Sequence, residues 1–505
     1  MRPALLALAI GCLHLNAHAQ STKSVTDLWA TNCQNCHGDK GQGGGAGTRT
    51  FLTAELFNQK HDRPFFDAIK NGLPDKGMAP FGETLDDKQV WGLVNFIREL
   101  QGRSLPHPAT PNKNGIVKTQ HLEFAIEPVA TESLDTPWSV EFIPSTDDTR
   151  PSWTMVVTNR PGFLTLYHSG KLLAKVGPDQ GLPPVWNSGQ GGLLDITIDP
   201  RYSQPGNDWI YLAFSDPRDN GKTSTTKLVR GKLTLANNVW TWTDQQTLFQ
   251  AKPAHYSGSG IHFGCTIVFD PADPETLFFG IGERGSGNLA QDLNRPNGKV
   301  HRIRRDGSIP KDNPFVGTDA KPASPDLYTS VWSFGHRNPQ GLAFDLHNRL
   351  FDTEHGPRGG DELNIILKAR NYGWPIISFG INYNGAPLVT PWADTAGKPA
   401  QDKDFVMPID RWMPSVGVCG LDTVRSDRYA SWKGDLLAGG LSGSSVDRFR
   451  LSPPTPDNAA PSVIEREEIL RGVGRVRDIL SAPDASIYIV TNGPDRVIRL
   501  VPAKK

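Results

Sequence analysis

The chain has 505 residues, and 53 lysine and arginine residues balance 53 aspartate and glutamate residues, so its formal net charge is zero at pH 7. This balance gives no reason to expect a nucleic-acid partner or an anionic membrane surface. The length, with 51 glycines and 41 prolines, is typical of two turn-rich domains with ample cores and excludes a disordered chain.

The first residues predict export. Arg2 precedes an apolar run at residues 4–13 and the sequence "AHA" at residues 17–19, which is the pattern of a secretory signal peptide occupying residues 1–19. The run is too short to cross a bilayer, and we expect no transmembrane segment elsewhere. A lipoprotein signal ending at Cys12 is the less favoured alternative. We therefore expect a soluble, periplasmic protein.

The stretch "NCQNCHGDKGQGG" predicts a covalently bound haem c. Cys33 and Cys36 are separated by two residues and His37 follows at once, which is the pattern in which two thiols bond the haem vinyl groups and the histidine ligates the iron. A zinc site would need two further ligands, and no second C-x-x-C or close histidine pair supplies them. The motif therefore indicates a carrier of single electrons.

The sixth iron ligand is predicted by elimination. Met78, in "GMAPFG", is the single methionine between the haem motif and residue 101. Thioether ligation raises the haem potential, which suits an acceptor of electrons from an organic donor. His61, in the charged stretch "KHDRPF", is the alternative, although that stretch is typical of a solvated turn.

Two amphipathic segments flank this motif. Apolar residues recur at helical spacing in residues 24–37 and 86–100, and the second segment has an acidic start. The arrangement resembles a small class I cytochrome c, which implies an all-α domain over residues 20–102. Residues 103–118 are rich in Pro, Asn and Lys and predict a linker.

The remainder, residues 119–505, has the texture of strands and turns. Units such as "FDPADPETLFFGIGERG" and "SAPDASIYIVTNGPDRVIRL" recur six times, about every 55 to 80 residues, as expected for four-stranded blades with loop insertions. We therefore expect a mainly β chain: a six-bladed β-propeller preceded by the small all-α domain. A pair of β-sandwiches explains six similar units less well.

Two arginines at the last of these units suggest an anionic ligand. Arg475 and Arg477 are two residues apart on a predicted strand, so both side chains point to one face, where guanidinium groups suit a carboxylate-rich ligand. Propeller blades bring such strand ends to a central channel.

Several longer stretches resemble one known family. "GQGGLLDITIDP", "HFG", "SFGHRNPQGLAFD", "TEHGPRGGDELN" and "GRVRDILSAPDASIYIVTNG" occur in the order found in the soluble pyrroloquinoline quinone (PQQ) dependent glucose, aldose-sugar and sorbosone dehydrogenases. These are six-bladed propellers that hold PQQ over the central channel. The resemblance implies a PQQ-dependent sugar dehydrogenase of the aldose type.

The resemblance also implies roles for individual residues. His262 would be the general base for the substrate hydroxyl, Arg337 would stabilise charge at the quinone oxygens, and Glu283 would lie near the sugar. The carbonyls of Gly356 and Pro357 would bind Ca2+. PQQ would be bound by Gln190, Asn288, Arg337, Asn338, Arg475 and Arg477.

The chain departs from the family at two places. The family motif continues "HFGGR", whereas here Cys265 and Thr266 follow "HFG", and Ser442 or its neighbours stand where the glucose-oxidising branch has a PQQ-binding lysine. Cys265 and Cys419 are left over from the haem motif and the signal. They form either a disulfide closing a loop of about 150 residues or two small buried thiols.

Together these features predict an oxidoreductase. Substrate oxidation would deliver two electrons to PQQ, and the haem would pass them singly to an external acceptor, a cytochrome or a quinone-linked chain. A lactonase-like hydrolytic propeller and a noncatalytic sugar-binding propeller are the alternatives. The sugar, alcohol or aldehyde that is oxidised cannot be deduced from the sequence.

Overall fold

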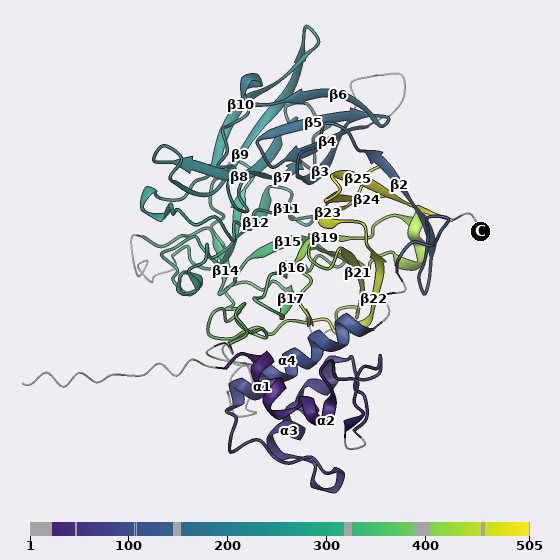
Figure 1. Cartoon of the computed structure of the whole chain (residues 1–505). Coiled ribbons are helices and arrows are strands. Elements are labelled where there is room, and N and C mark those ends of the chain that lie inside the picture. Colours follow the sequence, from purple (N-terminus) through teal and green to yellow (C-terminus); the bar gives the residue numbers. More distant parts are fainter. Residues whose placement is uncertain are drawn as a thin grey trace, which may run out of the picture.

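A computed structural model describes residues 23–45, 48–105, 107, 109–144, 153–317, 326–386, 388, 405–455 and 460–503. A helical unit lies against one side of a ring of β-sheets, and helix α4 (Asp87–Ser104) lies between that ring and the other helices (Figure 1). The predicted signal peptide and Cys12 lie outside the described residues. No described helix combines the length and apolar character needed to cross a membrane.

The helical unit confirms the all-α expectation for the N-terminal domain. Two of its helices, α1 (Val25–Asn32) and α4, follow the capping residues Ser24 and Asp86, whose side chains accept from backbone N–H groups of the first turn. The other elements are α2 (Gln34–His37), η2 (Gln59–His61), α3 (Asp62–Asn71) and η3 (Pro74–Lys76).

The core of the helical unit follows the predicted apolar spacing. Leu28 and Trp29 of α1 pack in one buried cluster with Leu93, Val94 and Ile97 of α4. These positions recur three and four residues apart, so each helix turns one apolar stripe inward. The same cluster includes Ile381 from the β-ring, so the two units share packing.

The described strands form six sheets, which confirms the six-bladed propeller. The innermost strands contact one another in a closed ring, β3–β7–β11–β15–β19–β23 and back to β3. The first three blades are β3 (Pro137–Pro144), β4 (Trp153–Asn159), β5 (Phe163–His168), β6 (Lys171–Val176); β7 (Leu193–Ile198), β8 (Ile210–Arg218), β9 (Thr223–Ala236), β10 (Val239–Phe249); and β11 (Ile267–Phe269), β12 (Thr276–Ile281), β13 (Lys299–Arg304), β14 (Val331–Phe334).

The remaining blades complete the ring. They are β15 (Pro339–Phe344), β16 (Leu350–Glu354), β17 (Asp361–Ile365), β18 (Asp410–Trp412); β19 (Val418–Thr423), β20 (Leu436–Gly440), β21 (Ser445–Leu451), β22 (Val463–Arg471); and β23 (Arg475–Ser481), β24 (Ile487–Asn492), β25 (Arg496–Pro502), β2 (Glu123–Ala130), β1 (Ile116–Lys118).

The ring is closed by pairing the start of the propeller with its end. Strand β2 pairs antiparallel with β25, with Ala125 opposite Val501, and β1 adds to the outer edge. The predicted linker at residues 103–118 therefore begins within the last turn of α4 and ends with a paired strand. Because the first and last strands share a blade, unrolling the ring would break a sheet.

The apolar core lies between neighbouring blades. Val156 and Leu164 of the first blade pack against Ile196 and Leu212 of the second, and all four are almost fully buried. The β-branched and aliphatic composition of the strands suits this burial from both faces. The strand ends that bound the channel are therefore held on a rigid frame.

Candidate functional site

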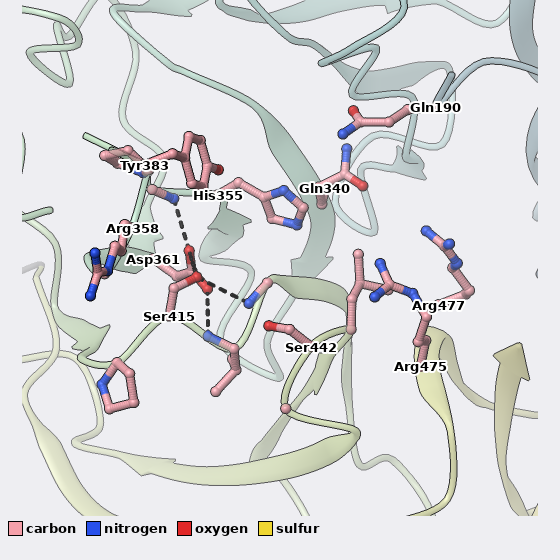
Figure 2. Close-up of a pocket in the computed structure, with 18 of the residues that line it drawn as sticks. Gln190, Gln340, His355, Arg358, Asp361, Tyr383, Ser415, Ser442, Arg475 and Arg477 are labelled. Carbon is pink, nitrogen blue, oxygen red and sulfur yellow. Dashed lines mark hydrogen bonds between the residues drawn. The ribbon is translucent and has the colours of Figure 1, made fainter. Parts of the chain in front are cut away.

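A cavity of about 770 Å³ opens at the ends of the inner strands, a size typical of small-molecule sites. Five residues predicted from the sequence line it: Gln190, Gly356, Pro357, Arg475 and Arg477. They come from the loop before β7, the turn after β16 and the start of β23, so the fold brings three distant blades together (Figure 2).

Three arginines crowd one side of this cavity. Arg477 stacks over the ring of Trp138 at 4.2 Å and donates its Nε to Asn492 at 2.7 Å. Burial lowers the pKa of Arg477 to about 10, and the positive charges of Arg475 and Arg160 act in the same direction. A carboxylate between these groups would relieve their repulsion, so this side of the cavity suits an anionic ligand.

Arg160 was not predicted from the sequence. It stands in the turn "NRPG" between β4 and β5, donates to the Gly189 carbonyl at 2.7 Å and has a buried Nε without a partner. Its place in a tight turn looks ordinary in the sequence, and only the assembled ring shows that it faces Arg477.

His262 and Glu283 form a buried pair next to the cavity. His262 Nδ1 lies 2.5 Å from a Glu283 carboxylate oxygen, and the two residues are 6% and 2% exposed. The backbone N–H of His262 donates to Gln190 at 2.8 Å. Because a carboxylate can only accept here, Nδ1 carries the proton and Nε2 keeps a free lone pair.

The protonation of His262 is set by opposing effects. Burial lowers its pKa, the hydrogen bond to Glu283 raises it, and the charge of Arg337 lowers it again. The net result is a pKa below the ordinary value, so the imidazole is neutral near pH 7 and able to accept a proton.

Glu283 lies between His262 and Arg337. Its backbone N–H donates to the Arg337 carbonyl at 2.8 Å, and its second carboxylate oxygen is buried without a partner. It does not belong to the cavity lining. Its contact to a sugar remains a prediction, whereas its contact to His262 is a feature of the structure.

Arg337 is buried and its charge points toward the turn after β16. Its Nη1 donates to the carbonyls of His355 at 3.0 Å and Gly356 at 2.7 Å, and its backbone N–H donates to Glu354. The Gly356 carbonyl is also one of the predicted calcium ligands. A cation there would share this oxygen with a guanidinium group.

Asn338 and Asn288, the two predicted cofactor-binding asparagines, differ in their surroundings. Asn338 is fully buried, and its side-chain oxygen accepts from Gly264 N at 3.1 Å. Asn288 lies in the short helix η6 (Gly287–Ala290), is exposed and is not part of the cavity lining. Asn338 therefore supports the His262 loop, and the contact of Asn288 to PQQ remains a prediction.

His355 and Gln340 line the cavity without having been predicted (Figure 2). His355 Nε2 is buried without a hydrogen-bond partner, and burial lowers the pKa of this histidine to about 3. A neutral ring with an unpartnered nitrogen leaves a polar contact free for a bound molecule. His355 lies within the family-like stretch "TEHGPRGGDELN", directly before Gly356 and Pro357.

All four cysteines among the described residues are free. Cys265 lies 3.5 Å from Thr226 Oγ1 and Cys419 lies 3.7 Å from Gln340 Oε1. The second of the two expected alternatives, two buried thiols, is the one in the structure. Cys265 has a φ of 103°, a conformation that favours glycine, and it stands where the family motif "HFGGR" has its second glycine.

The haem motif lies where α1 passes into α2. His37 packs 5.4 Å from Phe51 and 6.2 Å from Trp29, its Nδ1 is buried without a partner, and burial lowers its pKa. Met78 is partly buried on the same core, on a turn closed by hydrogen bonds with Leu73. Two thiols, a neutral imidazole and a thioether are the donor set of a haem c site.

His61, the alternative iron ligand, also has a buried nitrogen without a partner, its Nε2. It is the last residue of η2, and its ring centre lies 6.4 Å from that of Phe65. The assignment of Met78 as the sixth ligand therefore stays a prediction.

Comparisons with known proteins agree with this architecture. Residues 134–499 match the family model described as "Glucose / Sorbosone dehydrogenase", and residues 20–97 match "Cytochrome C oxidase, cbb3-type, subunit III". The chain is 35% identical over 366 residues to the aldose sugar dehydrogenase YliI of Escherichia coli (strain K12), covering 72% of this chain and 89% of that protein.

Solved structures show the same likeness. A crystal structure of a glucose dehydrogenase matches with a TM-score of 0.64 at 31% identity, covering 75% of this chain and all of that one. The PQQ-bound aldose sugar dehydrogenase of Streptomyces coelicolor matches with a TM-score of 0.54 at 25% identity, covering 75% of this chain and 98% of that one. The chain thus belongs to the glucose/sorbosone dehydrogenase family and carries a cytochrome c domain before its propeller.

Proposed function

We propose that this protein is a periplasmic quinohaemoprotein that oxidises an aldose sugar, or a related alcohol or aldehyde, with PQQ and passes the electrons through its own haem c to an external acceptor. The observation that carries the proposal is the buried His262–Glu283 pair next to a cavity that Arg475 and Arg477 line. His262 and Glu283 are not part of the cavity lining, but His262 adjoins it, because Phe263 and Gly264 line the cavity and the His262 N–H donates to the lining residue Gln190.

The residues of the cavity fit PQQ. Arg475 and Arg477 would bind its carboxylates, and Gln190 and the unpartnered nitrogen of His355 would add polar contacts. When bound, this cofactor supplies a quinone that accepts a hydride from the substrate carbon. Arg337 would stabilise the negative charge that develops on the quinone oxygens.

The chain's own contribution to the chemistry is proton transfer. His262 Nε2 would take the proton of the substrate hydroxyl, and the imidazolium that forms would be stabilised by Glu283 through Nδ1. Gln190 holds the backbone of His262 at the same time, so the base does not need to reorient. A positioned base of this kind contributes typically about 10²–10⁴-fold in rate.

Haem c and calcium complete the proposed cofactors. Cys33 and Cys36 would bond the haem, and His37 and Met78 would ligate its iron, which supplies one-electron transfer when bound. The carbonyls of Gly356 and Pro357 would contribute hard oxygen ligands to Ca2+. For calcium, the Gly356 oxygen offers its second lone pair, because Arg337 occupies the first.

A hydrolytic role finds less support in the site. A hydrolase of the lactonase type would need a metal ringed by free carboxylates. The cavity lining contains Glu99 and Asp361, but Glu99 pairs with Arg358, and Asp361 accepts from Ser415 and backbone N–H groups. Both carboxylates are therefore engaged.

The proposal is tested by following the haem spectrum after adding PQQ, Ca2+ and a panel of aldoses to the purified full chain. We expect reduction of the haem on addition of an oxidised sugar. His262→Ala should slow this reduction by about 10²–10⁴-fold while PQQ still binds, and His347→Ala, at an exposed turn, should change nothing. A haem that stays oxidised with every sugar, while PQQ is bound, would contradict the proposal.

A further inference from the structure

One wall of the cavity comes from the cytochrome domain. Glu99, Gly102 and Arg103, on the last turns of α4, line it together with propeller residues. The loops of a propeller alone leave its channel mouth open, and here a helix from another domain occupies one side of that mouth.

Helix α4 is held on the propeller by a buried ion pair. Glu99 receives two hydrogen bonds from Arg358, Nε to Oε1 and Nη2 to Oε2, both at 2.7 Å, and its side chain is only 4% exposed. Asn95, one turn earlier, donates to the Phe379 carbonyl at 3.3 Å. Swinging the helix away would leave the Glu99 carboxylate without its main partner.

Further contacts fix the domain at separate points. Val25 N of α1 donates to the Gly385 carbonyl at 2.9 Å, and Asp62 of α3 pairs with Arg411 of β18. At Gly102 a Cβ atom would lie 2.6 Å from the ring of Pro414, so α4 approaches the propeller as closely as a glycine allows. Contacts at three helices define one docked orientation.

The segments that receive the helices also build the cavity. Arg358 directly follows Gly356 and Pro357, and Tyr383 belongs to the turn that α1 holds through Gly385. Figure 2 shows Arg358 and Tyr383 across the cavity from Arg475 and Arg477. The docked domain therefore shapes the side of the cavity that faces the arginine pair.

Arg103 is the lining residue of α4 that extends furthest into solvent. Its side chain is 67% exposed and is tethered to Glu99 at 3.3 Å. Tyr383, on the propeller side, is 72% exposed. Both side chains line the cavity and extend into solvent at its opening, on the side that α4 occupies.

We propose that α4, through the bulk of Arg103, limits the length of the sugar, so that the protein oxidises monosaccharides and excludes oligosaccharides. This inference rests on the proposed function, because it concerns the substrate of that same cavity. A monosaccharide is small against this cavity, whereas the further units of an oligosaccharide would extend toward the exposed end of the lining, where Arg103 lies.

The test compares kcat/KM for glucose, maltose and maltotriose in the full-length holoprotein, with a dye as electron acceptor so that haem transfer does not enter the readout. We expect the wild type to prefer glucose, and Arg103→Ala to raise the maltotriose-to-glucose ratio about tenfold, as for removal of a small group from a pocket wall. Arg103→Met, which keeps the length without the charge, should retain the wild-type ratio.

Controls separate the possible failures. Arg63→Ala removes an exposed arginine of α3 that is not part of the cavity lining and should leave the ratio unchanged. A wild type that oxidises maltotriose as well as glucose, or an unchanged ratio in Arg103→Ala, would overturn the inference alone. A ratio raised equally by Arg103→Met would overturn exclusion by bulk. A wild type that oxidises no sugar would overturn the proposed function as well.

Discussion

His262 has an unusual backbone conformation and is held by two hydrogen bonds. Its φ of 57° lies in the left-handed region, which costs a non-glycine residue about 1–3 kcal/mol and persists only where the surroundings enforce it. Gln190 binds its backbone and Glu283 binds its ring. Such strain at a buried imidazole beside a cavity fits a residue placed for chemistry rather than for packing.

Glu283→Gln should change the pH profile of sugar oxidation as well as its rate. Because Glu283 raises the pKa of His262 against the effect of burial, the neutral glutamine should lower that pKa further. His262, as the proposed base, accepts a proton only when neutral, so kcat/KM should fall on the acid side of its pKa, and this acid limb should move to lower pH in the variant. Glu283→Asp, which keeps the charge, serves as the control, and an acid limb that does not move in Glu283→Gln would show that Glu283 does not act on the base.

Met78→Ala should remove the sixth ligand of the haem iron. We expect the sulfur-to-iron charge-transfer band of the oxidised protein to disappear and the haem potential to fall, because thioether ligation raises it. His61→Ala should leave both unchanged. The opposite result, with the band and potential altered by the His61 substitution alone, would assign the ligand to His61.

At the scale of elements, the spacing of apolar residues was enough to predict the two helices α1 and α4. The helices α1 and α4 lie where the apolar spacing and, for α4, the acidic start predict them, and the structure adds the capping residues Ser24 and Asp86. The pairing of Glu99 with Arg358 joins residues 259 positions apart, and no local sequence pattern predicts a contact over that separation. Docking of the domains therefore depends on the assembled surfaces.

Arg358→Ala should loosen this docking. It leaves Glu99 buried with only its weaker contact to Arg103, and removal of one partner of a buried pair costs about 3–5 kcal/mol. Differential scanning calorimetry should show a lower first transition, and limited proteolysis should become faster around residues 103–118. Arg499→Ala, which breaks an exposed pair with Glu127, should cost no more than about 1 kcal/mol. Equal effects of the two substitutions would show that the Glu99 pair does not fix the domains.

At the scale of the whole molecule, the repeated strand-turn units and the haem motif were enough to predict the order and type of the two domains. The cavity was only partly predictable. Arg160, His355 and Gln340 line it because strand ends from different blades converge, whereas Asn288, equally polar in the sequence, is exposed outside the lining. In the sequence, polar residues at turns cannot be told apart, because the assembly of the blades decides which of them face the cavity.

The wall that α4 adds to the cavity could not be predicted either, because it belongs to neither domain alone. Glu99 and Arg103 resemble ordinary solvent-facing positions of an amphipathic helix, yet one is buried against Arg358 and the other borders the cavity. The cytochrome c domain therefore forms part of the wall of the propeller's cavity.

The most direct test of this account is stopped-flow absorbance of the PQQ- and Ca2+-loaded protein mixed with an oxidised sugar, repeated over a wide range of protein concentrations. Because the cytochrome domain is docked beside the cavity, electrons should reach the haem within one molecule, and the observed rate constant of haem reduction should not depend on protein concentration. A rate constant that rises in proportion to protein concentration, or a haem that stays oxidised while a dye accepts electrons from the same sugar, would contradict the account.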